Sequence, residues 1–201
     1  MNNDINKKAI ILASASPRRK EILSSLGINF SILVADADES CDIRDPLAFA
    51  KELAKRKGQA AYSLTSEKDS IILSADTIVV CDGEILGKPK NREDAIRMIK
   101  KLSGKTHSVI TGVGVTVDGI TKTSCSETFV RVDTIPQSEI ERYVDSGDPM
   151  DKAGAYGIQG AFSRWISGID GCYFGVVGLP INCLANLFKE ITGKELTDFN
   201  N

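Results

Sequence analysis

A single carboxylate stands inside an otherwise apolar stretch of this sequence. The segment ILSADTIVV carries Asp76 between residues typical of a buried β-strand. Burying an unpaired carboxylate is costly, so this side chain must be paired, hydrated or bound to a metal ion. Carboxylates in such positions often act as general bases or metal ligands. In the alternative interpretation, Asp76 is structural and its oxygens accept hydrogen bonds from backbone N–H groups.

Two arginines follow a proline at a predicted helix start, in the segment ASASPRRK. We expect Ser16 to be the N-cap and Pro17 the first helical residue, which leaves free N–H groups in the first turn. Cations there cost about 0.3 to 1 kcal/mol each, whereas anions are favoured. Arg18 and Arg19 therefore predict a bound polyphosphate, with Ser14 beside it. Alternatively, these cations are solvated or pair with Asp36, Asp38 and Glu39.

A glycine-dense segment, DKAGAYGIQG, carries Gln159. Its glycines predict a tight loop that brings backbone close to a flat ligand. The glutamine amide offers a donor and an acceptor side by side, which is the pattern needed to pair with the imide edge of uracil or thymine. The alternative is an ordinary glycine loop that binds nothing.

Four further side chains are candidates for the same chemistry. Glu39 ends an acidic loop and could join Asp76 at a divalent ion, because Mg²⁺ favours one or two carboxylates plus substrate phosphates. Lys57 and Lys88, each taken alone, are more typical of surface lysines than of ligands. His107 is the only histidine. We favour a structural hydrogen bond for it, and a catalytic role stays open.

Both helices and strands are needed to position these residues. Periodicity predicts strands at 8–13, 29–34 and 70–80, a turn at CDGE, and a hairpin of long strands around VDGI within 106–132. It predicts helices at 17–26, 46–64, 91–104, 138–146 and 181–191. Because the order of these elements is mixed, we expect an α/β fold with a mixed, twisted sheet and flanking helices.

Composition excludes several classes of protein. The 201 residues can bury one sizeable core, in one compact or two-lobed unit. A net charge of −2 argues against general binding to nucleic acid or anionic membranes. The apolar runs are strand-sized, so neither a transmembrane helix nor a targeting segment is expected. Five widely spaced cysteines without a C-x-x-C pair predict reduced thiols in a cytoplasm.

Seven segments together resemble the Maf family of nucleoside triphosphate pyrophosphatases. In the family's order they are LASASPRR, LAKRKGQAA, SADTIVV, GEILGKP, LSGKTHSVITGV, DKAGAYGIQG and VVGLP. The resemblance covers nearly the whole chain and implies a single Maf-like domain over residues 1–201. It also implies an α/β fold similar to that of inosine triphosphatases with two lobes around a cleft, a divalent cation (Mg²⁺ or Mn²⁺) and a homodimer.

The resemblance further implies hydrolysis between the α and β phosphates of a nucleoside triphosphate. The AGAYGIQG segment resembles the corresponding segment of the family members that hydrolyse dTTP and UTP. Modified pyrimidine triphosphates stay open as further substrates. By position, Asp76 is implied as the proton acceptor, and Arg18, Thr77 and Gln159 as specificity residues. The polar cleft positions are matched by Ser14, Arg19, Glu39, Lys57, Lys88 and Lys152. Asp148 departs from the family, which more often has Glu there.

Two alternatives stay open at this point. The chain could be a pyrophosphatase for another nucleotide, such as 7-methyl-GTP. It could instead be a non-catalytic nucleotide-binding regulator of cell division. The embedded Asp76 favours catalysis, and the physiological role is open between nucleotide-pool sanitation and division arrest.

Overall fold

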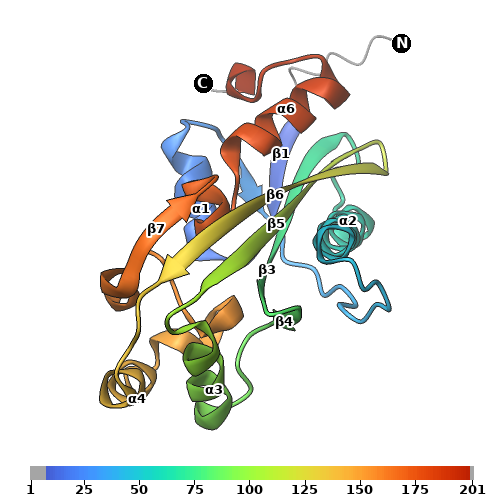
Figure 1. Cartoon of the computed structure of the whole chain (residues 1–201). Helices are drawn as coiled ribbons and strands as arrows, with labels where there is room; N and C mark the ends of the chain where they lie inside the picture. Colours follow the sequence, from blue (N-terminus) through green and yellow to red (C-terminus); the bar gives the residue numbers. More distant parts are fainter. Residues whose placement is uncertain (1–7, 200–201) are drawn as a thin grey trace. The chain divides into compact units, whose positions relative to one another are not determined.

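A computed structural model of the chain describes residues 8–199. Seven strands form one sheet in this range (Figure 1). They are β1 (Ala9–Ala13), β2 (Ser31–Ile32), β3 (Ser70–Cys81), β4 (Glu84–Leu86), β5 (Thr106–Val117), β6 (Ile120–Val132) and β7 (Ile166–Asp170). The strand order is β2-β1-β3-β5-β6-β7, and β4 pairs with β3 off this path.

The sheet is mixed, as the order of elements predicts. Strand β1 is parallel to both β2 and β3, whereas β3 pairs antiparallel with β4 and β6 pairs antiparallel with β7. Two Asp-Gly pairs make the tight turns after β3 and β5. Asp82 and Gly83 have φ of 50° and 76°, and Asp118 and Gly119 have φ of 50° and 81°. Positive φ at both central residues suits the right-handed twist of paired strands, so both turns predicted from these dipeptides are confirmed.

Six α-helices accompany the strands within residues 8–199. They are α1 (Pro17–Ser25), α2 (Pro46–Leu64), α3 (Arg92–Leu102), α4 (Gln137–Asp145), α5 (Tyr173–Val177) and α6 (Ile181–Thr192). Single turns of 3₁₀-helix lie at Asp148–Asp151, Ala153–Ala155, Ala161–Trp165 and Leu196–Phe199. None of the described helices combines the length and apolar character that crossing a membrane requires.

The chain divides into two compact units. One contains the described residues up to Asp76, Thr111–Ser126 and the residues from Gly178 onward. We call it the Asp76 unit. The other contains Thr77–Ile110 and Glu127–Val177, and we call it the Gln159 unit. The cleft and the single-domain extent implied by the resemblance stay predictions.

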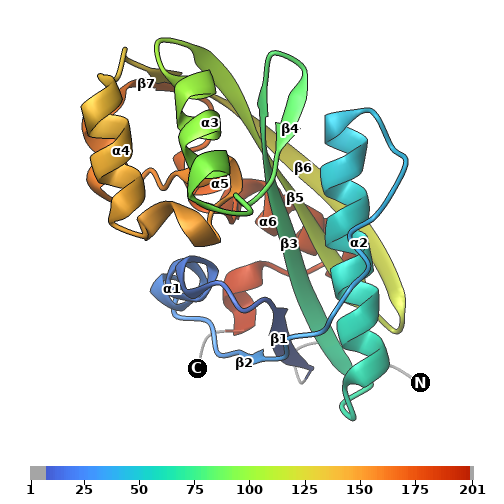
Figure 2. The same ribbon diagram turned by 90° about the horizontal axis from the view of Figure 1, so that it is seen from below.

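Each unit has an apolar core. In the Asp76 unit, Ile11, Ala13, Ala61 and Ile72 cluster between strands β1 and β3 and helix α2. In the Gln159 unit, α3 and α4 lie side by side (Figure 2). The core there includes four aromatic side chains: Tyr143, Tyr156, Phe162 and Trp165.

Helix α2 lies directly on strand β5 within the Asp76 unit because glycines remove the side chains between them. A Cβ on Gly112 would lie 2.2 Å from the carbonyl oxygen of Ala50, and a Cβ on Gly114 would lie 2.5 Å from Ser74 Oγ. The Ser74 hydroxyl also donates to the Ala54 carbonyl at 2.7 Å. This close packing holds α2 against the sheet. It thereby sets how far the side chains of α2 lie from the strands.

Replacing Gly112 with Ala should therefore lower the free energy of unfolding by about 3 kcal/mol. The new Cβ would overlap the Ala50 carbonyl, and the backbone of α2 or of β5 would have to shift to make room for it. Chemical denaturation measures this change. Gly87 is the matched control because a Cβ there meets no atom within 4 Å. Equal stability of the Gly112→Ala and Gly87→Ala proteins would contradict the packing of α2 on β5.

Candidate active site

Arg19 ties together the corner between β1 and α1. Its Nη1 donates to Ser14 Oγ at 3.1 Å, and its Nε donates to the carbonyl oxygen of Gly178 at 2.8 Å. Ser14 Oγ also accepts from the Ser16 N–H at 3.2 Å. Ser16 occupies the predicted N-cap position, but its side chain makes no capping hydrogen bond. The start of α1 is thus left without a side-chain cap from this residue.

The helix start carries a concentration of positive charge. The first turn of α1 contains no acidic residue, and Arg18 and Arg19 are its second and third positions. Burial lowers the pKa of Arg19, the charge of Asp76 raises it, and the neighbouring Arg18 lowers it. Guanidinium groups placed at the positive end of a helix dipole favour an anion at this corner.

Asp76 is buried and paired with a lysine from α2. The Lys57 ammonium bonds to Asp76 Oδ1 and lies 2.9 Å from Glu39 Oε1. Asp76 is 8% exposed, whereas the Glu39 side chain is 63% exposed. Burial lowers the pKa of Lys57, but the two carboxylates outweigh this, so the net pKa is raised. Lys57 is therefore fully charged at neutral pH, and the carboxylate predicted from the sequence is ion-paired.

The two carboxylates fit a divalent cation that arrives with a phosphate ligand. Glu39 and Asp76 converge on one cation, the Lys57 ammonium, so their oxygens already point toward a common position. Within residues 8–199 no three His, Cys, Asp or Glu side chains meet to hold a metal ion. Mg²⁺ and Mn²⁺ are commonly held by one or two carboxylates, with phosphates and water completing the shell.

In the Gln159 unit, Lys152 and Asp148 anchor the loop between α4 and Gln159. The Lys152 ammonium bonds to the Asp148 backbone carbonyl, to Asp148 Oδ1 at 3.1 Å and to Asp151 Oδ1 at 2.7 Å. Tyr143 donates its hydroxyl hydrogen to Asp148 Oδ2 at 2.8 Å. Asp148 therefore bonds on both carboxylate oxygens, although it departs from the residue usual in the resembled family.

Gln159 lies exposed in a turn at the end of this loop. The loop is joined to the segment after β4, because the N–H of Gly154 donates to the carbonyl of Gly87 at 3.0 Å. Lys88 follows Gly87 directly and is exposed. Thr77 is half-buried in β3, next to Asp76 in the chain.

The structure thus groups the predicted site residues by unit. The Asp76 unit holds Ser14, Arg18, Arg19, Glu39, Lys57 and Asp76, and the Gln159 unit holds Thr77, Lys88, Lys152 and Gln159.

Sequence reasoning missed several partners of these residues. Gly178 supplies the carbonyl that Arg19 binds, and Tyr143 fixes Asp148. Gly178 belongs to VVGLP, a segment that carries part of the family resemblance but no predicted site residue. No local pattern points to Tyr143, because its partner Asp148 lies beyond the end of its helix.

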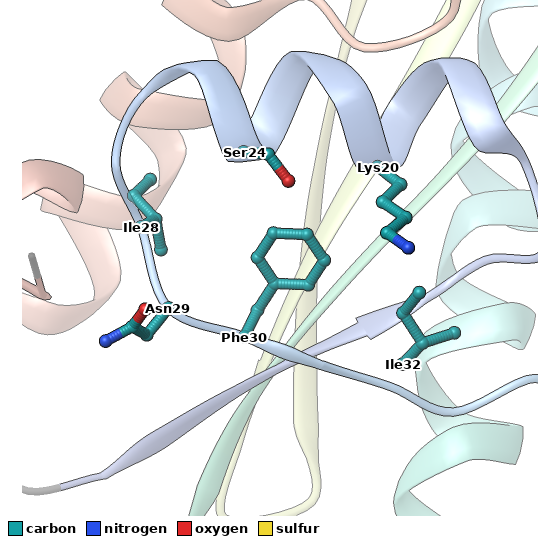
Figure 3. Close-up of a pocket in the computed structure, with 6 residues that line it drawn as sticks. All are labelled: Lys20, Ser24, Ile28, Asn29, Phe30 and Ile32. Atoms are coloured by element: carbon teal, nitrogen blue, oxygen red, sulfur yellow. The ribbon is translucent and has the colours of Figure 1, made fainter.

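A surface pocket of about 410 Å³ lies elsewhere in the Asp76 unit, between α1 and the segment that leads into β2 (Figure 3). The Phe30 ring points toward α1 in its centre. Its lining residues are Lys20, Ser24, Ile28, Asn29, Phe30 and Ile32. None of the predicted site residues lines this pocket, and a single lysine is its only charged lining group, so we do not assign a triphosphate to it.

Comparison with known proteins adds independent information. The family model described as "Maf-like protein" matches residues 9–191. A dTTP/UTP pyrophosphatase from Agathobacter rectalis is 46% identical over 198 residues, which cover 90% of this chain and 95% of the relative. Proteins of the same name from Desulforamulus reducens and Chromobacterium violaceum are 45% and 44% identical, covering 90% and 92% of this chain and 96% of each relative.

Proposed function

The chain belongs to the Maf family, and we propose that it is a nucleoside triphosphate pyrophosphatase that hydrolyses dTTP and UTP to the monophosphate and pyrophosphate. The names of the relatives that match along almost their whole length support this substrate pair. The structural observation that carries the proposal is the buried Asp76, held by Lys57 in the same unit as the arginine-rich start of α1. Pyrophosphate release from a panel of nucleoside triphosphates tests it.

The phosphates have a binding group at the start of α1. Arg18 and Arg19 present guanidinium groups, which match phosphate oxygens in pairs, and the first-turn N–H groups add further donors. Ser14 holds Arg19 through its hydroxyl. We assign two tasks to these guanidinium and N–H groups: they orient the triphosphate, and they stabilise the negative charge that develops on the leaving pyrophosphate. Lys88 and Lys152 are assigned to phosphate contact in the Gln159 unit.

Asp76 is assigned as the general base. Lys57 bonds to its Oδ1, so Oδ2 is the oxygen to which we assign the proton of the attacking water. The water oxygen bonds to the α phosphorus, the bond from that phosphorus to the α–β bridging oxygen breaks, and pyrophosphate leaves with the bridging oxygen. Lys57 holds the Asp76 carboxylate in place during this step, because its ammonium is itself held by ion pairs to both Asp76 and Glu39.

Glu39 and Asp76 are the residues that would hold the proposed Mg²⁺ or Mn²⁺. When bound, such an ion neutralises phosphate charge and lowers the pKa of a coordinated water. The raised pKa of Lys57 keeps its ammonium charged beside both carboxylates.

Gln159 is assigned to base recognition, together with Arg18 and Thr77. Replacing Gln159 with Ala should lower kcat/KM for UTP and dTTP by roughly tenfold while that for GTP changes little, since a lost pair of base hydrogen bonds costs about 1 to 2 kcal/mol. Steady-state rates with UTP, dTTP, CTP and GTP measure the ratio.

Gln137 provides the control for this substitution. It is an exposed glutamine of α4 that bonds to Glu141 within its own helix. The Gln137→Ala protein should keep the wild-type ratio of UTP to GTP rates. If Gln159→Ala also kept that ratio, Gln159 would have no part in reading the base.

A cytoplasmic location, a homodimer and the absence of nucleic-acid and membrane binding remain predictions from the sequence. Gel filtration of the purified protein measures the oligomeric state.

A further inference from the structure

Several buried side chains attach the loop that ends at Gln159 to the interior of its unit, and Tyr156 is the polar one among them. This tyrosine is 5% exposed, and its ring packs on Phe162 with 4.6 Å between the ring centroids. Its hydroxyl lies 2.7 Å from Nε2 of His107, and the two rings meet edge to face at 5.3 Å. Tyr156 precedes Gln159 by three residues, so this hydrogen bond fixes the backbone close to the exposed amide.

His107 is a costly residue for this position if it serves packing alone. It is 2% exposed, and its Nδ1 has no hydrogen-bond partner in the described part of the chain. Leaving a buried polar atom unpaired disfavours the fold, and an apolar side chain of similar shape would avoid this cost. Burial lowers the pKa of His107 to about 4, so the ring is neutral at physiological pH. The hydrogen bond to Tyr156 is the polar interaction that this side chain contributes.

The loop needs such an attachment because its backbone is strained. Gly154 has φ of 68° and the non-glycine Ala155 has φ of 60°. The left-handed region is unfavourable for a residue with a Cβ, so the loop relaxes unless its surroundings hold it. On one side the Gly154 N–H bonds to Gly87, and on the other the Gly157 N–H bonds to the Tyr143 hydroxyl. Tyr156 lies between these two attachments.

We propose that His107 and Tyr156 are positioning residues, which act through their shared hydrogen bond to hold Gln159 in place for recognition of the pyrimidine base. Neither side chain contacts the substrate in this account. The proposal rests on the proposed function, because it assigns these two residues to the selectivity of the same reaction. The structural hydrogen bond expected for His107 is the one to Tyr156, and the proposal adds a role in selectivity to it.

Three variants test the hydrogen bond: Tyr156→Phe, His107→Leu and the double variant. Two readouts are taken on each full-length protein. The first is the ratio of kcat/KM for UTP to that for GTP. The second is hydrogen exchange of the backbone amides in 153–160, which needs no catalysis. The control is Val109→Ala, because Val109 lies on the same strand as His107 and is buried, at 2% exposure, in the core that contains Tyr156.

Each single variant should lower the UTP-to-GTP ratio roughly three- to tenfold, mainly through KM for UTP, as expected for one lost hydrogen bond. Exchange in 153–160 should quicken by a similar factor. The double variant should lose no more than the worse single variant, because both residues act through one bond. A His107→Gln variant, which keeps a donor and an acceptor, should recover part of the ratio. The Val109→Ala protein should be less stable, but its UTP-to-GTP ratio and its hydrogen exchange in 153–160 should match those of the wild type.

Unchanged exchange and an unchanged ratio in Tyr156→Phe would overturn the positioning role, and so would fully additive losses in the double variant. A protein that is inactive toward every triphosphate would instead reject the proposed function. Exchange of 153–160, together with calorimetric binding of α,β-methylene-UTP, would then still decide whether His107 and Tyr156 hold the loop.

Discussion

Replacing Asp76 with Asn is expected to lower kcat for UTP and dTTP by roughly 10²- to 10⁴-fold, because positioned general bases contribute on this scale. Asparagine has the same shape and can still accept a hydrogen bond from Lys57, but it cannot take a proton from water. The change leaves a half-buried ammonium, with the exposed Glu39 carboxylate as its remaining acidic partner among the described residues. We therefore expect a folded protein of somewhat lower stability, as checked by circular dichroism and thermal unfolding.

Asp118 offers the matched control for this variant. It also pairs with a lysine, since the Lys8 ammonium lies 2.8 Å from Asp118 Oδ1. Its φ of 50° suits asparagine, so Asp118→Asn removes one carboxylate charge without straining the turn. This variant should turn over at nearly the wild-type rate. A near wild-type kcat in Asp76→Asn would remove Asp76 as the base.

Replacing Arg19 with Lys is expected to lower kcat/KM for UTP roughly 10- to 100-fold. Lysine keeps the charge but loses the fork that bonds to Ser14, to the Gly178 carbonyl and to phosphate oxygens together. Hydrogen bonds to charged groups contribute about 1.5 to 3 kcal/mol, which corresponds to this range. Calorimetric titration with α,β-methylene-UTP measures the loss of binding apart from turnover.

Arg92→Lys provides the same substitution at an exposed ion pair, where Arg92 lies 2.7 Å from Asp145. It should leave kcat/KM unchanged, because exposed pairs contribute little. If Arg19→Lys lost thermal stability but bound the analogue as tightly as the wild type does, Arg19 would be a structural residue of the corner and not a phosphate ligand.

Local signals in the sequence were sufficient for helices, strands and turns whose ends are set by neighbouring residues. Helix α2 begins and ends at the predicted residues, Pro46–Leu64, because an Asp45 cap and a following proline define its start. Helix α3 lies within the predicted range and begins with a local cap, because the Asn91 side chain accepts from the Asp94 N–H at 2.9 Å. Strand β5 begins at the predicted position, and both Asp-Gly turns lie where the sequence predicts them.

Elements that depend on distant pairing were predicted poorly. Strand β2 is two residues long, where a strand over 29–34 was expected, and it pairs only through Ser31 and Ile32 with β1. Strand β7 and helix α5 were not predicted, because the glycines of ISGIDGCYFG interrupt both the strand-like and the helix-like spacing of its apolar residues. Strand β7 forms by pairing with β6, with Ile169 opposite Val130, and that pairing has no local signal.

The candidate site shows the same division. The sequence marks Asp76 as an unusual carboxylate, because its type conflicts with its strand, and Gln159 through the glycines around it. It does not show that Lys57 meets Asp76, because that ion pair depends on the close approach of α2 to the sheet at Gly112 and Gly114. The tie of Arg19 to Gly178 joins residues 159 positions apart and cannot be read from either segment.

The most direct measurement is the product analysis of the purified protein incubated with UTP or dTTP and Mg²⁺ or Mn²⁺. We expect one pyrophosphate for each UMP or dTMP formed, at rates above those for CTP, ATP, GTP and 7-methyl-GTP. Release of inorganic phosphate and a diphosphate would contradict cleavage between the α and β phosphates. The absence of pyrophosphate from every triphosphate would contradict the enzymatic function itself.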